Sequence, residues 1–555
     1  MKYAKVTLRG RYRETGSQVS SLKTAVSHDF RFDHFLIRVE KLLRKPRVKR
    51  ILVVCTPDFQ PMLWGGAEAI RTQLQRLGEA GREVWFYANS YQPLQLYLAS
   101  ACSRRVLHPL GSLSFLGLAR SFLFFKRALG KANIDAYILR RGEYKSAGDR
   151  FRTDQLDSAN RLQYQEFFDS TAAELQYKIC AGFGKSKEEL NQLQNGLILP
   201  ACAAESSHWI DEVKTLDRLE AEWKEEKYRK LRPKKPGRAY IISREPNARH
   251  SPRKLGIRRK KLAVLVFEGA IIDGKSKQLP LLGQALGSES FVPHIRSLEK
   301  DKSVKGVVLR VNSGGGSASA SEDILDALSR LKEKKPLVVS MGEVAGSGGY
   351  WIACRGERLF AHHSTLTGSI GVISIFFYLE KFLKKHGVTV SSLKSGPYAD
   401  LGSVLHSMDK KEREIIDAEI ERVYQLFLER VAEGRGSLVP KIDALAKGRV
   451  WAGESARAHG LVDEIGGIEA ALAYLKGKLE LPRVKVEFYP RIKHSFLEKQ
   501  LMRSQSRSQI ADPEGVQYPD LQAVGALLEL ARNYSIHSAR GLRPFAAMPE
   551  WWLQL

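Results

Sequence analysis

The order of apolar and polar positions in the second half of the chain predicts alternating strands and helices. Residues 307–311 form a short apolar, β-branched run of the kind that builds a buried strand, and residues 336–341 form another. Between these runs, Ile324, Leu328 and Leu331 recur at the spacing of one helix face. A strand, a helix and a second strand in this order predict a βαβ unit with a parallel sheet.

A similar pattern occurs in the first half of the chain, displaced by 254 residues. The segment 70–77 aligns with 324–331 at this offset, and 210–213 parallels 462–465. Such self-similarity indicates two halves of the same fold. We therefore predict an N-terminal tail at 1–33, a first repeat at 34–226, a linker at 227–261, a second repeat at 262–490 and a C-terminal tail at 491–555.

The composition is that of folded domains, but the charge is unevenly distributed. The 555 residues are 43% hydrophobic and 27% charged, which disfavours wholesale disorder and a polytopic membrane protein. Half of the net charge of +28 lies in the predicted linker, where 15 Lys and Arg accompany one acid, Glu245. Such a segment is either a solvated linker or a peripheral contact for anionic membrane lipid. No motif for nucleic-acid recognition accompanies it, so no nucleic-acid partner is expected.

Neither the cysteines nor the apolar segments indicate export or a membrane span. The five cysteines are odd in number and scattered, and no two form a CxxC pair, which argues against a disulfide framework or a zinc site. The N-terminus is basic but lacks the apolar core of a signal peptide. The apolar window 370–379 has only ten residues and is too short to cross a bilayer.

Ser347 is the first candidate for chemistry. It lies between Gly346 and the pair Gly348 and Gly349, after a predicted strand and before an apolar helical segment. Glycines leave room for a scissile peptide to approach a serine hydroxyl, and a helix N-terminus offers free N–H groups to a developing oxyanion. The same pattern also fits a tight turn with a serine N-cap.

A glycine-rich loop follows the predicted strand that ends at Val311. This loop, NSGGG at 312–316, lacks the GKS or GKT of a phosphate-binding loop and the glycine spacing of a dinucleotide-binding loop. Two interpretations remain. One is an oxyanion hole with one N–H here and one beside Ser347, and the other is a flexible turn.

A nucleophilic serine needs a base, and the sequence offers several. His362 and His363 follow the candidate serine, but they come after an apolar stretch, where a histidine is more often structural. Lysine is the other choice. At the repeat offset Lys145 aligns with Ala399, so each half carries a residue that the other lacks, and a working site then needs both halves. Lys394 is a competing base, five residues short of the aligned position.

Four motifs are specific in combination. They are GSGGYWIA around Ser347, TGSIGV from Thr367, VNSGGG from Val311 and GEYKSA around Lys145. Together they resemble the motifs of the signal peptide peptidase A family, also called protease IV, in its double-length form, over about residues 34–480. The resemblance implies an α/β fold, a tandem repeat of two Clp protease/crotonase-like domains, each a βαβ-built sheet flanked by helices.

The resemblance also implies a function. It indicates a serine endopeptidase with a Ser/Lys dyad that degrades cleaved signal peptides or other apolar peptides, with no cofactor and no metal. Ser347 is implied as the nucleophile, Lys145 as the general base and Ser369 as the serine that orients the lysine. The backbone N–H groups of Gly315 and Gly348 are the expected oxyanion donors.

Further expectations concern assembly and location. The family usually forms a homotetramer of double-length chains and is associated with a membrane. Since neither a signal peptide nor a membrane anchor is found in the sequence, we expect a cytoplasmic protein or one peripheral to the inner membrane. Gly314 stands where the family's glycine loop usually has proline, which predicts a less rigid oxyanion loop.

The chemistry sets a condition on Lys145, and two other functions remain open. An ordinary lysine, with a pKa near ~10.4, is almost fully protonated at neutral pH, so the base must be buried enough to lower its pKa by ~3 units. One alternative function is a crotonase-like acyl-CoA enzyme, which shares the fold and an oxyanion hole. The other is a non-catalytic scaffold whose basic linker docks on a membrane surface.

Overall fold

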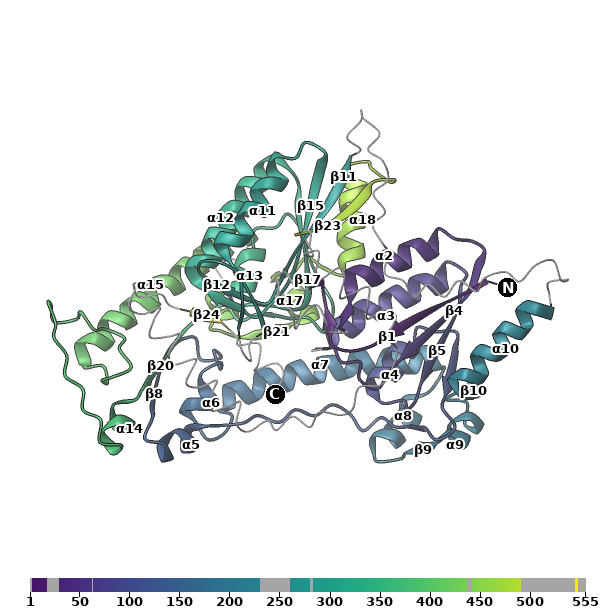
Figure 1. The fold of residues 1–555 in the computed structure, drawn as a ribbon, viewed down its shortest axis with the longest axis horizontal. Helices are drawn as coiled ribbons and strands as arrows, with labels where there is room; N and C mark the ends of the chain where they lie inside the picture. Colours follow the sequence, from purple (N-terminus) through teal and green to yellow (C-terminus); the bar gives the residue numbers. More distant parts are fainter. Residues whose placement is uncertain are drawn as a thin grey trace. The chain divides into compact units, whose positions relative to one another are not determined.

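The computed structural model describes residues 2–16, 29–61, 63–229, 260–279, 283–436, 442–490 and 545–547. Most of the predicted linker and most of the predicted C-terminal tail lie outside these residues. The described chain forms two compact units (Figure 1). The first comprises residues 2–16, 29–119 and 168–229, and the second comprises residues 120–167 and the described residues from 260 onward.

The second unit contains a sheet whose central strands are parallel. In the described part of this unit, β11, β15, β17, β18 and β22 are neighbours in that order, and all pair in parallel. Their bounds are Lys261–Glu268, Val304–Ser313, Leu337–Gly346, Leu359–Ala361 and Glu464–Ile465. At one edge β23 (Lys485–Tyr489) pairs with β11. At the other, β19 (Leu366–Gly368) pairs with the end of β17, and β21 (Val450–Ala452) pairs antiparallel with β19.

Helices cover both faces of this sheet, which explains why its strands are apolar at successive positions. Helices α11 (Ser288–Lys300) and α12 (Ala318–Lys334) share one hydrophobic core with alternate residues of β11, β15 and β17. On the opposite face lies α18 (Ile468–Lys478) (Figure 1). Its Leu475 packs against Gly306 of β15. All ten residues of β17 are buried, as expected for a strand covered on both sides.

A second sheet in the same unit joins strands from distant parts of the sequence. Its order is β13, β14, β12, β16, β24, β20 and β8. Their bounds are Lys277–Leu279, Gly283–Gly287, Ala270–Ile272, Gly315–Ser317, Phe545–Ala547, Val372–Tyr378 and Asp135–Arg141. Strand β8, from the first half of the sequence, pairs antiparallel with β20 along its whole length. Strand β24 pairs antiparallel with β16 and, at Phe545, with Ile373 of β20.

The first unit repeats the strand order of the second. Its described strands β1, β4, β5, β6 and β10 are neighbours in that order and pair in parallel. Their bounds are Lys2–Leu8, Val48–Cys55, Glu83–Ala88, Arg104–Leu107 and Glu212–Val213. Helix α3 (Trp64–Glu79) lies between β4 and β5 in sequence, as α12 lies between β15 and β17. The predicted fold class, a tandem α/β repeat, is confirmed.

The compact units divide the chain differently from the predicted repeats. Residues 2–8, which fall in the predicted N-terminal tail, form β1 with Ala4, Val6 and Leu8 buried. Residues 120–167, which fall in the predicted first repeat, belong to the second unit because β8 pairs with β20. The first half of the sequence therefore contributes a segment to the unit that carries Ser347.

Across the described ranges, no helix combines the length and the apolar character that a membrane span requires.

Candidate active site

Ser347 occupies a strained turn between β17 and α13 (Gly348–Ala353). Its backbone has φ 55° and ψ −122°, a conformation that residues other than glycine rarely adopt. The N–H of Ser347 donates to the carbonyl oxygen of Gly368 in β19 at 2.8 Å, which holds the turn against the neighbouring strand. A sharp strand-to-helix turn of this kind resembles a nucleophile elbow, and here Ser347 is buried.

The glycines after Ser347 are required by close packing against the loop between β15 and β16. A Cβ atom on Gly348 would lie 3.2 Å from Cα of Gly315, and a Cβ atom on Gly349 would lie 2.4 Å from the carbonyl oxygen of Ser313. Larger side chains at these two positions would push the loop away. The two glycine segments singled out in the sequence therefore lie side by side, with Ser347 where they meet.

The two expected oxyanion donors differ in their hydrogen bonds. Gly348 is the first residue of α13, and the first N–H groups of a helix have no partner within it. The N–H of Gly315 instead donates to Ser313 Oγ at 3.1 Å, and Ser313 Oγ donates to the carbonyl oxygen of Gly269 at 2.7 Å. Gly315 has φ +100°, so this loop conformation depends on glycine.

The side chain of Lys145 reaches the hydroxyl of Ser347. Its Nζ lies 2.8 Å from Ser347 Oγ, 2.7 Å from the carbonyl oxygen of Ser369 and 3.0 Å from Ser369 Oγ. A neutral amine satisfies all three contacts, because its two N–H groups can point to Ser369 while its lone pair accepts the O–H of Ser347. This arrangement is suited to removal of the serine proton by the lysine.

Burial makes the neutral form of Lys145 accessible. The side chain is only 1% exposed, and burial alone lowers the pKa of Lys145 from 10.5 to about 7. The ammonium form loses its hydration in this position, whereas the neutral amine loses much less. Close to neutral pH, a large fraction of the lysine is therefore able to accept a proton.

The backbone of Lys145 is fixed by the segment that precedes β21. The N–H of Tyr144 donates to the carbonyl oxygen of Lys447 at 3.0 Å. Gly448 has φ +76°, and a Cβ atom on it would lie 2.6 Å from Cβ of Lys145 and 2.7 Å from its backbone nitrogen. Only glycine allows the two chain segments to approach this closely.

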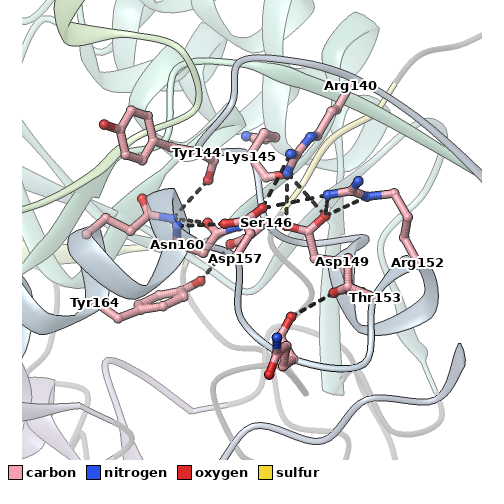
Figure 2. A network of polar contacts seen from close by, with 12 residues as sticks. Arg140, Tyr144, Lys145, Ser146, Asp149, Arg152, Thr153, Asp157, Asn160 and Tyr164 are labelled. Carbon is pink, nitrogen blue, oxygen red and sulfur yellow. Dashed lines mark hydrogen bonds and ion pairs between the residues drawn. The ribbon is translucent and has the colours of Figure 1, made fainter.

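A buried ionic network also holds the loop of Lys145, as Figure 2 shows. The carboxylate of Asp149 accepts hydrogen bonds from Arg140 at 2.9 and 3.1 Å and from Arg152 at 2.8 and 3.0 Å. It also accepts one from Nδ2 of Asn160 at 2.6 Å. Arg140 further donates to the carbonyl oxygen of Lys145 at 3.3 Å. Because a buried carboxylate needs several partners, this network favours one conformation of the loop.

The competing bases lie elsewhere. His362 and His363 follow β18, and the ring of His363 lies 3.6 Å from the carboxylate of Glu454. Lys394 pairs with Asp400 at 2.5 Å, and this hydrogen bond raises the pKa of Lys394. A lysine whose pKa is raised keeps its proton at neutral pH and is unsuited to act as a base. Among these candidate bases, Lys145 is the one whose side chain is shown within hydrogen-bond distance of the Ser347 hydroxyl in the described structure.

One group of side chains in the second unit has the composition of a metal site. Asp400, His406 and Glu412 each offer a ligand atom, and these atoms lie within 4.8 Å of one another. However, Asp400 already pairs with Lys394, and the Glu412 carboxylate accepts the N–H of Asp409 in a helix capping box. Since both carboxylates have partners in the protein, we assign this group no metal.

The sequence interpretation did not single out Gly448, Asp149 or Gln163, which also contacts the lysine loop. The only local signal for Gly448 is a lysine–glycine pair before a short apolar run, which predicts a turn but not its partner. Asp149 and Gln163 have no such signal, because their importance depends on groups that folding brings to them.

Comparison with known proteins identifies the class that this fold and site define. Peptidase family S49 matches the chain twice, over residues 76–230 and over residues 329–481. The two matches together cover more than half of the chain. The chain therefore belongs to peptidase family S49, and the presence of one match in each half agrees with the tandem repeat.

Several curated proteins are similar to the chain over most of its length. Protease 4 of Haemophilus influenzae is 33% identical over 404 residues, which are 71% of this chain and 64% of that protein. Protease 4 of Salmonella typhi is 30% identical over 422 residues, 75% of this chain and 67% of that protein. The chloroplastic serine protease SPPA of Arabidopsis thaliana is 29% identical over 423 residues, 76% of this chain and 62% of that protein.

These comparisons confirm the predicted family resemblance. The matched region spans about two thirds of the length of these relatives, at 62% to 67%. The family assignment thus rests on similarity over most of the chain.

Proposed function

We propose that the chain is a serine endopeptidase that hydrolyses peptide bonds with a Ser/Lys dyad. The observation that carries this proposal is the 2.8 Å contact between Nζ of the buried Lys145 and Oγ of Ser347. A serine hydroxyl becomes a nucleophile when a neighbouring base takes its proton, and a desolvated lysine is such a base. Membership of a peptidase family supports the same activity.

The proposed reaction begins when Ser347 Oγ attacks the scissile carbonyl carbon and Nζ of Lys145 takes the hydroxyl proton. The carbonyl π electrons move onto the oxygen, and the N–H of Gly348 donates a hydrogen bond to this oxyanion. The N–H of Gly315 donates a second one after it leaves its present acceptor, Ser313 Oγ. The carbonyl then re-forms, the C–N bond breaks as Lys145 gives the proton to the leaving amine, and an acyl-enzyme remains. Water, deprotonated by the same lysine, attacks the ester carbonyl carbon. The bond from that carbon to Ser347 Oγ breaks, and the lysine returns the proton to Oγ. Ser369 holds Nζ in place through both steps.

The proposed substrates are extended, apolar peptides, with cleaved signal peptides as the natural class. A peptide can pair with β16 in the place that β24 occupies, which puts its carbonyl groups beside the loop of Gly315. The antiparallel pairing of β24 with β16 supports this mode of binding.

From the resemblance to the signal peptide peptidase A family, we also propose a homotetramer and peripheral contact with anionic membrane. The proposed location is the cytoplasm or the inner membrane.

The experiment that tests this function compares wild type, Ser347→Ala and Lys145→Met with the matched control Lys394→Met. Each protein is assayed with casein or a signal-peptide substrate and with a serine-reactive fluorophosphonate. We expect each dyad variant to lose about 100-fold or more of its peptidase rate, the range typical of a lost base or nucleophile. The control should match wild type. Peptidase activity in the Ser347→Ala variant would exclude the Ser/Lys dyad mechanism. A thioesterase activity that does not depend on Ser347 would favour the acyl-CoA alternative.

A further inference from the structure

Gln163 is a buried polar residue whose side chain spans two chain segments of the active site. It lies near the start of α7 (Ser158–Phe183) and is 1% exposed. Its Nε2 donates to the carbonyl oxygen of Tyr144 at 2.9 Å, and its Oε1 accepts the N–H of Val450 at 3.0 Å. Both ends of the carboxamide are therefore in use.

The two peptide groups that Gln163 contacts belong to the machinery around the base. The carbonyl of Tyr144 is part of the peptide bond that carries the N–H of Lys145. The N–H of Val450 is part of the peptide bond whose carbonyl, on Arg449, accepts the N–H of Ser369 at 2.7 Å. One side chain thus connects the backbone of the lysine to the backbone that holds its serine partner.

The orientation of the Gln163 carboxamide follows from its neighbours. Asp149 is an acceptor, so the group that Asn160 presents to it at 2.6 Å must be the amide nitrogen. Oδ1 of Asn160 then faces Gln163 and accepts a hydrogen bond from Nε2 at 2.5 Å. Oε1 of Gln163 is left for the N–H of Val450. The ionic network in Figure 2, which includes Asp149 and Asn160, therefore fixes the direction of the whole chain of hydrogen bonds.

We propose that Gln163 is a positioning residue that sets Nζ of Lys145 against Ser369 and Ser347. This inference rests on the proposed function, since it assigns a role within that reaction. Only a carboxamide of this length supplies a donor at one end and an acceptor at the other. Glutamate keeps the acceptor but loses the donor, and methionine of similar length supplies neither. Both ends of the buried Gln163 carboxamide bond to protein groups, so its loss should act on the chemical step rather than on substrate binding.

The test uses Gln163→Met and Gln163→Glu, with the exposed Gln165→Met on the same helix as the matched control. Fluorophosphonate titration first counts the reactive Ser347 in each preparation, and thermal melting confirms the fold. We expect kcat per reactive site to fall by about 10- to 100-fold in Gln163→Met with KM unchanged, because a displacement of about 1 Å has effects of this size. The midpoint of the pH–rate profile should move to higher pH as the lysine becomes better solvated.

A merely structural role predicts a different result. It lowers the fraction of reactive protein but leaves kcat per site and the pH midpoint unchanged, and that outcome would overturn the inference. If Gln163→Met does not fold, Gln163→Glu decides by the same criteria. Failure of the proposed function is separate, because wild type would then show no dependence on Ser347 or Lys145. Wild-type dependence on both residues, together with Gln163 variants that behave as Gln165→Met does, would refute the positioning role alone.

Discussion

At the scale of single residues, the proposed chemistry depends on Lys145, whose amine is shielded from water. Burial is the cause of the lowered pKa of Lys145, and its three hydrogen-bond partners are uncharged groups of Ser347 and Ser369. A carboxylate at this position would stabilise the ammonium form and raise the pKa. In the proposed mechanism, Lys145 can act as a base near neutral pH because water and carboxylates are excluded from its amine.

This burial makes Lys145 a source of instability that depends on pH. A pKa lowered from 10.5 to about 7, at about 1.4 kcal/mol per unit, destabilises the fold by about 5 kcal/mol when the lysine is protonated in both states. The full penalty applies below pH 7 and declines as pH rises toward 10.5, because the unfolded chain then holds the proton that the folded chain has lost.

We therefore expect Lys145→Met to be more stable than wild type at neutral and acidic pH. The difference in the free energy of unfolding should shrink steadily in more alkaline buffers. Chemical denaturation of both proteins at several pH values measures it, with Lys394→Met as the control for a lysine that is not buried. A variant that is less stable than wild type at neutral pH would contradict the assigned burial.

At the scale of elements, the site is built where short glycine segments let backbones approach. The turn at Ser347 packs against the loop of Gly315, and Gly448 packs against Lys145. The strands and helices supply rigid ends, and the glycines allow those ends to meet at contact distance. Substitution of one glycine therefore tests the geometry without a change in any functional group.

Gly448→Ala should displace the lysine. Its Cβ would lie 2.6 Å from Cβ of Lys145, and alanine disfavours φ +76°. We expect a loss of about 1–3 kcal/mol in stability and a fall of at least about 10-fold in kcat. Gly477→Ala in α18 is the matched control, because nothing lies within 4 Å of its added Cβ. Equal kinetics in the two variants would show that the close approach at Gly448 does not matter.

The short strand β24 occupies a place beside the site. It pairs with β16 and β20, so it takes the backbone partners that an added peptide strand would use. Proline lacks the N–H and does not fit a strand with neighbours on both sides, so Ala546→Pro should release β24. We expect KM for peptide substrates to decrease in Ala546→Pro relative to the Ala546→Ser control. An unchanged KM would mean that β24 does not compete with peptides.

Much of the site's chemistry was predictable from the sequence, but the residues that hold Lys145 in place were not. The glycines around Ser347 are a local sequence signal for a turn, and the alignment of the two repeats indicated Lys145 as a candidate base. The structure brings these two side chains to 2.8 Å. Gln163 was not predictable, because its value comes from two peptide groups far apart in the sequence that meet only in the folded chain.

At the scale of the whole molecule, the two halves of the sequence have similar folds, but they do not coincide with the two compact units. Both sheets have the same order of parallel strands, as the repeat predicted. The segment 120–167 nevertheless belongs to the unit formed mainly by the second half, because β8 completes the sheet of β20. Periodicity predicts strands and helices, but it does not tell which sheet a strand will join, so the division of the chain could not be predicted.

The charge of the basic linker leads to a separate prediction. Residues 227–261 carry 15 Lys and Arg against one acid, and 230–259 lie outside the described structure. If this charge contacts anionic lipid, sedimentation with phosphatidylserine vesicles should decrease steeply as salt screens the interaction. Neutral vesicles serve as the control. Binding that is insensitive to salt would rule out an electrostatic contact.

The most direct test of the account is the rate at which a fluorophosphonate modifies Ser347 as a function of pH. In wild type the second-order rate constant should rise between about pH 5 and about pH 9 with a midpoint near 7, because the neutral form of Lys145 is the reactive one. Lys145→Met should react slowly at every pH. A wild-type rate that does not depend on pH, or the same profile in Lys145→Met, would contradict the claim that a buried neutral lysine activates the serine.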